Sequence, residues 1–462
     1  MAFDVQSLSD IVGGRLRLAD LPPLGGMWEP LGRFVTRMDR ICEGDVLLAT
    51  GTTSAANPAF ASEAYQRGAL GVVSATTPVE PWAGRFSIHV EDMDWAVWKL
   101  ARVARTEFPG RVIAVAGPIG KSITCAMIEA VLGGDTCAPW REETSSDAQL
   151  TEQLLDLDDD KAYAIVEMHG ATPSELDAAA NLCCADIAVI VNPKLAAGGA
   201  RPFAELGPWE ELAATVPDNG AAIAGPVLNP RALASAGPTL QTFGRNGECD
   251  AAVSHVFCEP GLLSFVVDGQ VARVKAWGRH YLESALAAWC VGREAGIAED
   301  VIAWRLGQAA IPPGRCEPID RGEVQFIDNT ASRSPLARAS ALELLATASD
   351  AKRRVAVVGG WPGKDADCAQ ASGELLNIAG ADFLIATGPA AEALIDSAVE
   401  AGMRRDHCRR CADSDALLEE LPDILTFGDI VLLSDIDAQA AQGVLALFPN
   451  TTPAVQPIRR AA

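Results

Sequence analysis

The chain has 462 residues, of which 49% are hydrophobic and 21% are charged, and its formal net charge is −24. This length suggests about three domains, and the apolar content excludes wholesale disorder. Because so acidic a surface repels phosphate backbones, we expect no nucleic-acid partner. The first residues show no basic segment followed by an apolar run, and no apolar stretch is long enough to span a bilayer. We therefore expect a cytoplasmic protein without a membrane partner.

The first predicted unit covers residues 1–105, where short apolar runs alternate with glycine and proline. Strands are expected at 44–50 and 68–76, with a helix in the segment PAFASEAYQRGA between them. This pattern predicts a small α/β domain.

The second predicted unit covers residues 106–312. Its first strand, 111–117, is continuously apolar and enters a glycine turn, and a helix is expected over 122–134, ending in Gly-Gly. Further strands are expected at 162–168 and 185–192, with the helical segment SELDAAANLCC between them. Continuously apolar strands that alternate with helices are typical of a parallel sheet covered on both faces.

The third predicted unit covers residues 313–462 and has the same alternation of apolar strands and helices. Its strands are expected at 323–329, 353–360, 381–388 and 429–435. This pattern predicts a second doubly wound α/β domain. The tail after Pro453 is expected to fray.

The twelve cysteines are expected to be free thiols, because disulfide frameworks are typical of short secreted chains. Cys408 and Cys411 form a CxxC beside His407. A structural zinc site usually needs a second cysteine pair, and the sequence contains no second CxxC. The pattern therefore favours two free thiols over a metal site.

The most informative motif is GPIGKS, which comprises Gly117 to Ser122 between a predicted strand and a predicted helix. Glycines allow backbone N–H groups to surround phosphate oxygens, and a helix N-terminus contributes positive potential. Lys121 would contact the β- and γ-phosphates of ATP, and the Ser122 hydroxyl would bind magnesium. The alternative is a plain strand-to-helix turn. Because Val115 occupies the place of the first Walker glycine, the loop has the short GxxGK[ST] form.

Several segments, in order along the chain, resemble the Mur ligase family, closest to the branch that adds D-alanyl-D-alanine during peptidoglycan biosynthesis. The segments are ICEGDVLLAT, AVAGPIGKSITCAMIEAVL, Val166-Glu167-Met168 with the helix and strand that follow, Gly278-Arg279-His280, Pro313-Gly314-Arg315, and Ile327-Asp328-Asn329-Thr330 as far as Pro335. They extend from about residue 10 to about residue 400. Several independent matches in the right order are more specific than any single motif.

The resemblance implies an α/β protein with three domains. These are an N-terminal substrate-binding domain, a central P-loop domain that binds ATP, and a C-terminal Rossmann-like domain. It also implies a ligase that activates a carboxylate as an acyl phosphate and joins it to an amino acid or dipeptide. The implied catalytic residues are Lys121, Glu167 and Arg315; the nucleotide contacts are Gly117, Gly120, Lys121, Ser122, Ile123, Ser284, Arg315 and Asp328; the magnesium ligands are Ser122 and Glu167, with His169 as a candidate.

The sequence departs from the family pattern around the second metal site. Ala197 stands where the family has a histidine, and the segment 209–220 lacks the turn with the carbamylated lysine. His169 follows Glu167 by two positions on a predicted strand, so both side chains share one face, and its imidazole could replace the missing one. The alternative is a packed or exposed histidine without a metal role.

The substrate-binding and adenine-side positions depart as well. Residues 37–39 and 55–60 differ from the family segments that grip the UDP-sugar, and the family's two asparagines near the nucleotide correspond to Ser284 and Ile119. We therefore expect an ATP- and magnesium-dependent ligase with an altered substrate. Two alternatives stay open: a non-catalytic protein that binds nucleotide or a protein partner, and the ordinary muramyl-tripeptide ligase.

Overall fold

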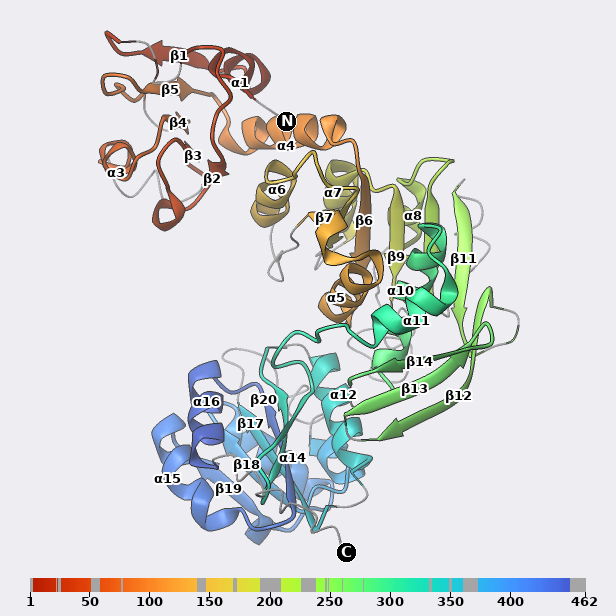
Figure 1. Ribbon diagram of the computed structural model, residues 1–462. Coiled ribbons are helices and arrows are strands. Elements are labelled where there is room, and N and C mark those ends of the chain that lie inside the picture. Colours follow the sequence, from red (N-terminus) through yellow and green to blue (C-terminus); the bar gives the residue numbers. More distant parts are fainter. Residues whose placement is uncertain are drawn as a thin grey trace, which may run out of the picture.

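The computed structural model describes most of the chain, and its elements form three sheets (Figure 1). The residues outside the description are 1–2, 22, 24–25, 51–58, 76–77, 139–146, 169–172, 192–208, 226–237, 246, 248, 260, 277, 332–334, 349–350, 360–372 and 449–462. His169, Ala197 and the tail after Pro453 are among them, so the predictions for these positions lie outside the described residues. None of the described helices has the length and apolar content that a membrane span requires.

The N-terminal sheet has five strands in the order β1-β5-β4-β3-β2. Its elements are α1 (Val5–Val12), β1 (Arg15–Leu18), β2 (Phe34–Val35), η1 (Met38–Arg40), β3 (Val46–Leu48), α3 (Phe60–Gln66), β4 (Gly71–Ser74) and β5 (Phe86–His89). β1 runs antiparallel to β5, and the other neighbours are parallel. The predicted strands at 44–50 and 68–76 and the helix between them are confirmed by β3, β4 and α3, within the residues that the structure describes.

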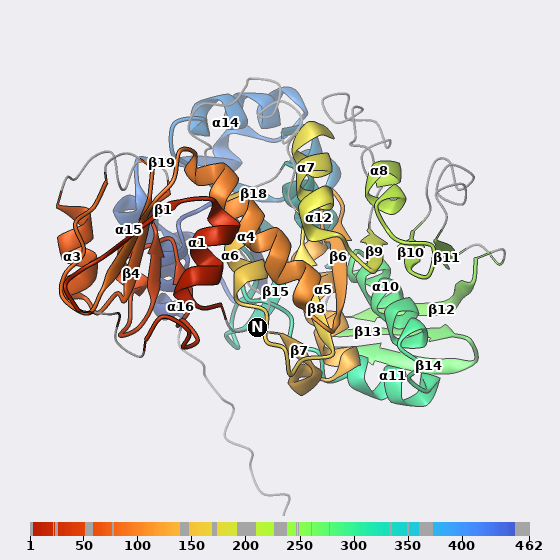
Figure 2. The same cartoon turned by 90° about the horizontal axis from the view of Figure 1, so that it is seen from above.

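Helix α4 (Met93–Glu107) connects the N-terminal sheet to the central one. Leu100 packs in the core of the N-terminal sheet, whereas Ala101 and Phe108 pack in the core of the central sheet. Figures 1 and 2 show the helix between the two parts. Because successive positions of one helix are buried in different cores, α4 fixes the two parts to each other.

The central sheet has nine strands in the order β14-β13-β12-β11-β10-β9-β6-β8-β7. Its elements are β6 (Arg111–Ala116), α5 (Lys121–Leu132), η2 (Gly134–Thr136), β7 (Cys137–Ala138), α6 (Asp147–Leu155), β8 (Tyr163–Glu167), α7 (Pro173–Cys183), β9 (Ile187–Ile190), α8 (Trp209–Ala214), β10 (Ala221–Ala224), β11 (Thr239–Gly244), β12 (Ala251–Glu259), β13 (Leu262–Val267), β14 (Gln270–Val274), α10 (Tyr281–Glu294) and α11 (Glu299–Leu306). The strands from β7 to β12 are parallel, as predicted for the segments 111–117, 162–168 and 185–192.

The antiparallel ribbon β12-β13-β14 at one edge of this sheet was not predicted from the sequence. The signal for it in the sequence is the dipeptide Asp268-Gly269, and in the structure both residues have the positive φ that a two-residue hairpin turn requires, at 50° and 78°. Leu262–Val267 also alternates between partly and fully buried positions, which is the period of a half-buried strand.

The C-terminal sheet has six strands in the order β15-β16-β20-β17-β18-β19. Its elements are β15 (Glu317–Asp320), β16 (Gln325–Asn329), α12 (Pro335–Ala346), β17 (Arg353–Gly359), β18 (Phe383–Thr387), α14 (Ala391–Glu400), η4 (Arg405–His407), β19 (Cys408–Cys411), α15 (Ser414–Ile424), β20 (Asp429–Ser434) and α16 (Ala438–Leu447). All neighbours except β15 and β16 are parallel, so the predicted doubly wound sheet is confirmed. The chain returns to insert β20 between β16 and β17, which joins residues far apart in sequence.

The CxxC pair lies on the edge strand β19. Cys411 packs in the core with α15 and β20, whereas Cys408 packs against the core on the other face of the sheet. Residues three apart on a strand point to opposite faces, so these two thiols cannot bind one metal ion together.

Candidate functional site

The phosphate loop lies between β6 and α5, and two of its glycines are required by the backbone. Gly117 has a φ of 149°, and a Cβ atom at this position would lie 2.2 Å from the carbonyl oxygen of Val191. Gly120 has a φ of 83° and precedes the first residue of α5. The loop therefore turns at positions where other residues would be strained, and it leads into a helix N-terminus that attracts anions.

Lys121 opens α5, and its Nζ donates a hydrogen bond to the carbonyl oxygen of Gly117 at 2.9 Å. Burial lowers the pKa of the Lys121 ammonium, the nearby Glu167 carboxylate raises it, and the positive charge of Arg315 lowers it. These three charged groups, which the sequence motifs placed at positions 121, 167 and 315, are thus close enough to affect one another.

Ser122 and Glu167 form the second part of the site. Glu167 ends β8, which pairs in parallel with β6 in the register Val115↔Glu167. The Ser122 Oγ donates to the Glu167 Oε1 at 3.0 Å, and the two residues are only 2% and 3% exposed. Magnesium prefers oxygen ligands and usually takes one or two carboxylates with several waters, so this donor set fits the ion.

Arg315 lies on the segment that joins α11 to β15, and the backbone of this segment is held from both the C-terminal and the central parts. Gly314 has a φ of 69°, and its carbonyl oxygen accepts a hydrogen bond from the Ala331 N–H at 2.9 Å. The hydroxyl of Tyr281, the first residue of α10, donates to the carbonyl oxygen of Arg315. Sequence reasoning missed Tyr281, because no motif marks a buried phenol at the start of a helix.

Asp328 lies on β16 of the C-terminal sheet. Its Oδ1 accepts hydrogen bonds from the backbone N–H of Thr330 at 3.0 Å and from the Thr330 Oγ1 at 2.7 Å. Within the described part of the chain no hydrogen bond joins this carboxylate to the phosphate loop. Burial raises the pKa of the Cys316 thiol, and the negative charge of Asp328 raises it further, which places Asp328 near the residue that follows Arg315.

Ser284 and Ile123 pack behind the phosphate loop. The Ser284 Oγ donates to the carbonyl oxygen of Gly120 at 3.4 Å, and Ser284 is 1% exposed. Ile123 is 7% exposed and belongs to the central core. The structure therefore brings both residues to the phosphate loop. Ser284 on α10 and Ile123 on α5 lie behind the backbone of the loop and support it.

His280 precedes α10 and lies next to Tyr281. Its ring centroid is 4.2 Å from that of Tyr281, and its buried Nε2 has no hydrogen-bond partner among the described residues. Burial lowers the pKa of His280 to about 4, so the imidazole is neutral near pH 7.

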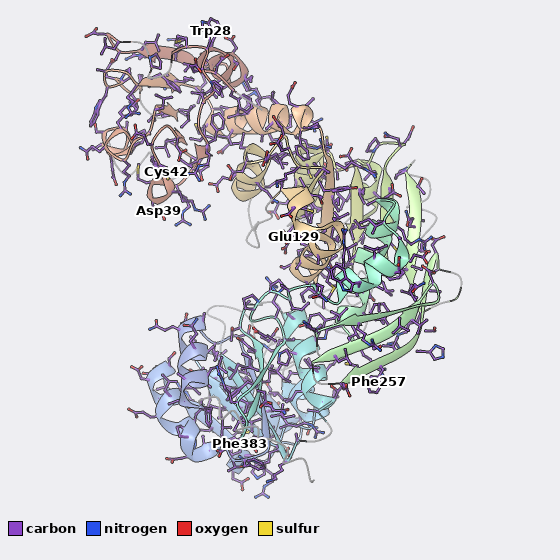
Figure 3. All side chains as sticks on the ribbon, viewed as in Figure 1. Trp28, Asp39, Cys42, Glu129, Phe257 and Phe383 are labelled. Carbon is purple, nitrogen blue, oxygen red and sulfur yellow. The ribbon has the colours of Figure 1, made fainter. Side chains whose placement is uncertain are left out.

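Two of the N-terminal positions that differ from the family pattern, Arg37 and Asp39, contact each other, whereas residues 55–58 of the other differing segment lie outside the described residues. The Arg37 guanidinium donates to both carboxylate oxygens of Asp39, at 3.1 and 2.7 Å. Figure 3 shows Asp39 and Cys42 at the lower end of the N-terminal part, and Glu129 on α5 in the central part. The Arg37 and Asp39 side chains are 58% and 62% exposed, so this ion pair lies at the surface.

No family model matches the chain. The UDP-N-acetylmuramoyl-tripeptide–D-alanyl-D-alanine ligase of Escherichia coli (strain K12) is 24% identical over 412 residues, which cover 85% of this chain and 88% of the relative. The enzyme of the same name from Bacillus subtilis (strain 168) is 25% identical over 311 residues, 65% of this chain and 67% of the relative.

Solved structures of the same class share the fold. A crystal structure of MurF from Acinetobacter baumannii has a TM-score of 0.80 at 18% identity and covers 97% of this chain and 99% of its own. MurF ligase from Thermotoga maritima, solved in complex with ADP, has a TM-score of 0.71 at 21% identity and covers 90% of this chain and 96% of its own. The chain is therefore a homologue of the Mur ligases and has the Mur ligase fold.

Proposed function

We propose that this chain is an ATP- and magnesium-dependent ligase that joins a carboxylic acid to the amine of an amino acid or dipeptide in the cytoplasm. The observation that carries the proposal is the buried Ser122–Glu167 pair, 3.0 Å apart, beside Lys121 at the carboxyl ends of β6 and β8. Ligands of open α/β sheets bind at this edge. The similarity to D-alanyl-D-alanine ligases supports the reaction type.

The phosphate loop would bind the triphosphate of ATP. The N–H groups between Gly117 and Ser122 and the N-terminus of α5 supply partial positive charge. Lys121 must leave the carbonyl oxygen of Gly117 to contact the β- and γ-phosphates. Ile123 and Ser284 hold the loop in place, and Asp328 would contact the ribose after the C-terminal part has closed on the nucleotide.

Ser122 and Glu167 would hold a magnesium ion, with His169 as a further candidate outside the described residues. The ion would neutralise charge on the phosphate oxygens. Both side chains are almost fully buried, so little reorganisation is needed to present their oxygens.

The reaction takes place in two steps. In the first step, a carboxylate oxygen of the substrate attacks the γ-phosphorus of ATP. The bond between this phosphorus and the β-phosphate oxygen breaks, so that ADP is released and an acyl phosphate is formed. The neutral amine then attacks the acyl carbon, phosphate departs, and the amine loses one proton. Negative charge that develops on the transferred phosphoryl group would be stabilised by Lys121 and by Arg315, whose positive charge acts on Lys121.

The acid substrate is proposed to differ from a UDP-muramyl tripeptide, and residues 1–105 are the proposed substrate domain. Arg37 and Asp39 form a mutual ion pair in place of the family's sugar-binding segment. The proposed ATP-binding domain covers 106–312, and the proposed Rossmann-like domain covers 313–462.

The test is ATP binding by calorimetry with magnesium, on wild type and Lys121→Ala. Wild type should bind, and Lys121→Ala should lose at least about tenfold in affinity, because a charged contact to phosphate is removed. Lys161→Ala is the matched control, since the Lys161 Nζ also donates to a backbone carbonyl, that of Asp135, at 3.0 Å.

A screen of acids and amines for phosphate release then tests ligation. Release that requires both an acid and an amine supports the ligase. ATP binding without release under any pairing would contradict ligation and favour the non-catalytic alternative. If wild type does not bind ATP, the nucleotide site itself is refuted and a protein partner becomes the better hypothesis.

A further inference from the structure

A buried series of hydrogen bonds runs from the linker before β15 into the C-terminal sheet. The Cys316 Sγ donates to the Asn329 Oδ1 at 3.4 Å, and the Asn329 Nδ2 donates to the Ser434 Oγ at 3.4 Å. The Ser434 Oγ donates to the Asp435 Oδ2 at 2.9 Å, and the Arg338 Nε donates to the same oxygen at 2.7 Å. We call these five residues the linker network.

The linker network is shielded from water. Cys316, Asn329 and Ser434 are 4%, 2% and 0% exposed. The side chains of Arg338 and Asp435 are 9% and 1% exposed. Because a buried polar group that loses its partner pays a desolvation penalty, such a network resists rearrangement and holds its members in one geometry.

Two members of the linker network have an unusual backbone. Cys316 has a φ of 52° and Asp435 has a φ of 56°, which is the left-handed region that favours glycine. Non-glycine residues persist there only where their surroundings hold them, and such residues cluster at functional sites. Within the part of the chain that the structure describes, the Asp435 Oδ1 is also buried without a hydrogen-bond partner.

The linker network ends at the residue next to Arg315. The Tyr281 hydroxyl donates to the carbonyl oxygen of Arg315 and, at 3.4 Å, to that of Cys316. The backbone of Arg315 is therefore held from α10 on one side and, through Cys316, from the C-terminal sheet on the other. The charge of Arg315 in turn acts on Lys121.

We propose that Cys316 and Asn329 are positioning residues, which set the Arg315 guanidinium beside the terminal phosphate of ATP. The proposal rests on the proposed function, because it needs a nucleotide at the phosphate loop. Through Asn329 and Ser434, the orientation of the C-terminal sheet determines where Arg315 points. The network thus acts on the γ-phosphate and leaves the binding of ADP unaffected.

The test compares magnesium-dependent binding of ADP and of a non-hydrolysable ATP analogue, AMPPNP, by calorimetry. Wild type should bind AMPPNP more tightly than ADP, because only AMPPNP reaches Arg315. Cys316→Ala removes the thiol and keeps the left-handed backbone, and it should weaken AMPPNP binding by about tenfold with ADP affinity unchanged. Cys316→Ser keeps a donor to Asn329 and should restore the preference.

Cys290→Ala is the matched control, since burial raises the pKa of both the Cys290 and the Cys316 thiols to about 12 and Cys290 lies outside the network on α10. It should leave both affinities unchanged. If Cys316→Ala shows no cooperative thermal unfolding transition, Cys316→Gly is used in its place, because glycine adopts the left-handed backbone without strain. A Cys316 variant with the wild-type preference for AMPPNP overturns the positioning role alone. Failure of wild type to bind either nucleotide overturns the proposed function as well.

Discussion

The central and C-terminal sheets each place a glycine where a neighbouring strand comes very close. A Cβ on Gly117 would lie 2.2 Å from the carbonyl oxygen of Val191, and a Cβ on Gly359 would lie 1.9 Å from that of Asp435. Both glycines follow or end a parallel strand at its carboxyl end. The surroundings differ: the first glycine opens a phosphate loop, whereas the second packs against a buried ion pair.

The same close approach of a backbone oxygen to a glycine therefore occurs in two different settings. Around Gly117 the loop leaves N–H groups and a helix N-terminus available to an anion. Around Gly359 the space is taken by Asp435, whose carboxylate accepts hydrogen bonds from Arg338 and Ser434. The carboxyl end of a parallel strand is therefore a ligand site only where side chains do not fill it.

The largest expected effects come from adding a methyl group at these two glycines. Gly117→Ala and Gly359→Ala should each destabilise the fold by at least about 4 kcal/mol, because a backbone oxygen must move. The two variants should differ in function: Gly117→Ala should lose nucleotide binding, whereas Gly359→Ala should retain ADP binding. Thermal unfolding and ADP calorimetry measure both effects.

Gly134→Ala is the control for this pair, because a Cβ there would meet no atom within 4 Å. It should match wild type in both measurements. Equal ADP affinities for the two destabilised variants would show that the two sheet edges do not differ as described.

The next effect concerns the buried ion pair of the C-terminal sheet. Arg338→Leu should destabilise the fold by about 3–5 kcal/mol, because it leaves the Asp435 carboxylate buried without its cation. The double variant Arg338→Leu with Asp435→Asn should recover much of this loss. Urea unfolding of the two single variants and the double variant gives the coupling energy.

Arg404→Ala removes a partner of Asp406 from a pair that is exposed on both sides, and it serves as the control. It should change little, since exposed pairs contribute little to stability. If Arg338→Leu and Arg404→Ala lowered the free energy of unfolding by the same amount, burial would not be the reason that the Arg338–Asp435 pair stabilises the fold.

The smallest expected effect is the pH dependence from His280 in the central part. Its pKa is lowered from 6.5 to about 4, so below pH 6.5 the unfolded chain takes up a proton that the folded chain does not. The free energy of unfolding is therefore unaffected by His280 above pH 6.5, and it decreases by up to about 3 kcal/mol as the pH falls towards 4. In the His280→Asn variant, the free energy of unfolding should depend less on pH in this range. Urea unfolding at several pH values between 7 and 4 measures this dependence, and the same dependence as in wild type would refute the assignment.

The sequence alone determined the local features of this protein. The phosphate loop is contiguous from Gly117 to Ser122, so its glycines, lysine and hydroxyl could be predicted from one segment. Glu167 could be predicted from its place at the end of an apolar strand, and the structure puts it 3.0 Å from the Ser122 hydroxyl. The roles of these residues in catalysis and nucleotide binding stay predictions.

The tertiary structure decided which distant residues meet. Asn329 and Ser434 are 105 positions apart, and Arg338 and Asp435 are 97 apart, yet each pair is joined because β20 is inserted beside β16. No periodicity or local spacing encodes such a contact, since it depends on the order of strands in the sheet. The hydrogen bond from the Tyr281 hydroxyl to the Arg315 carbonyl oxygen is a contact of the same kind. It joins residues 34 positions apart, because α10 packs against the linker that carries Arg315.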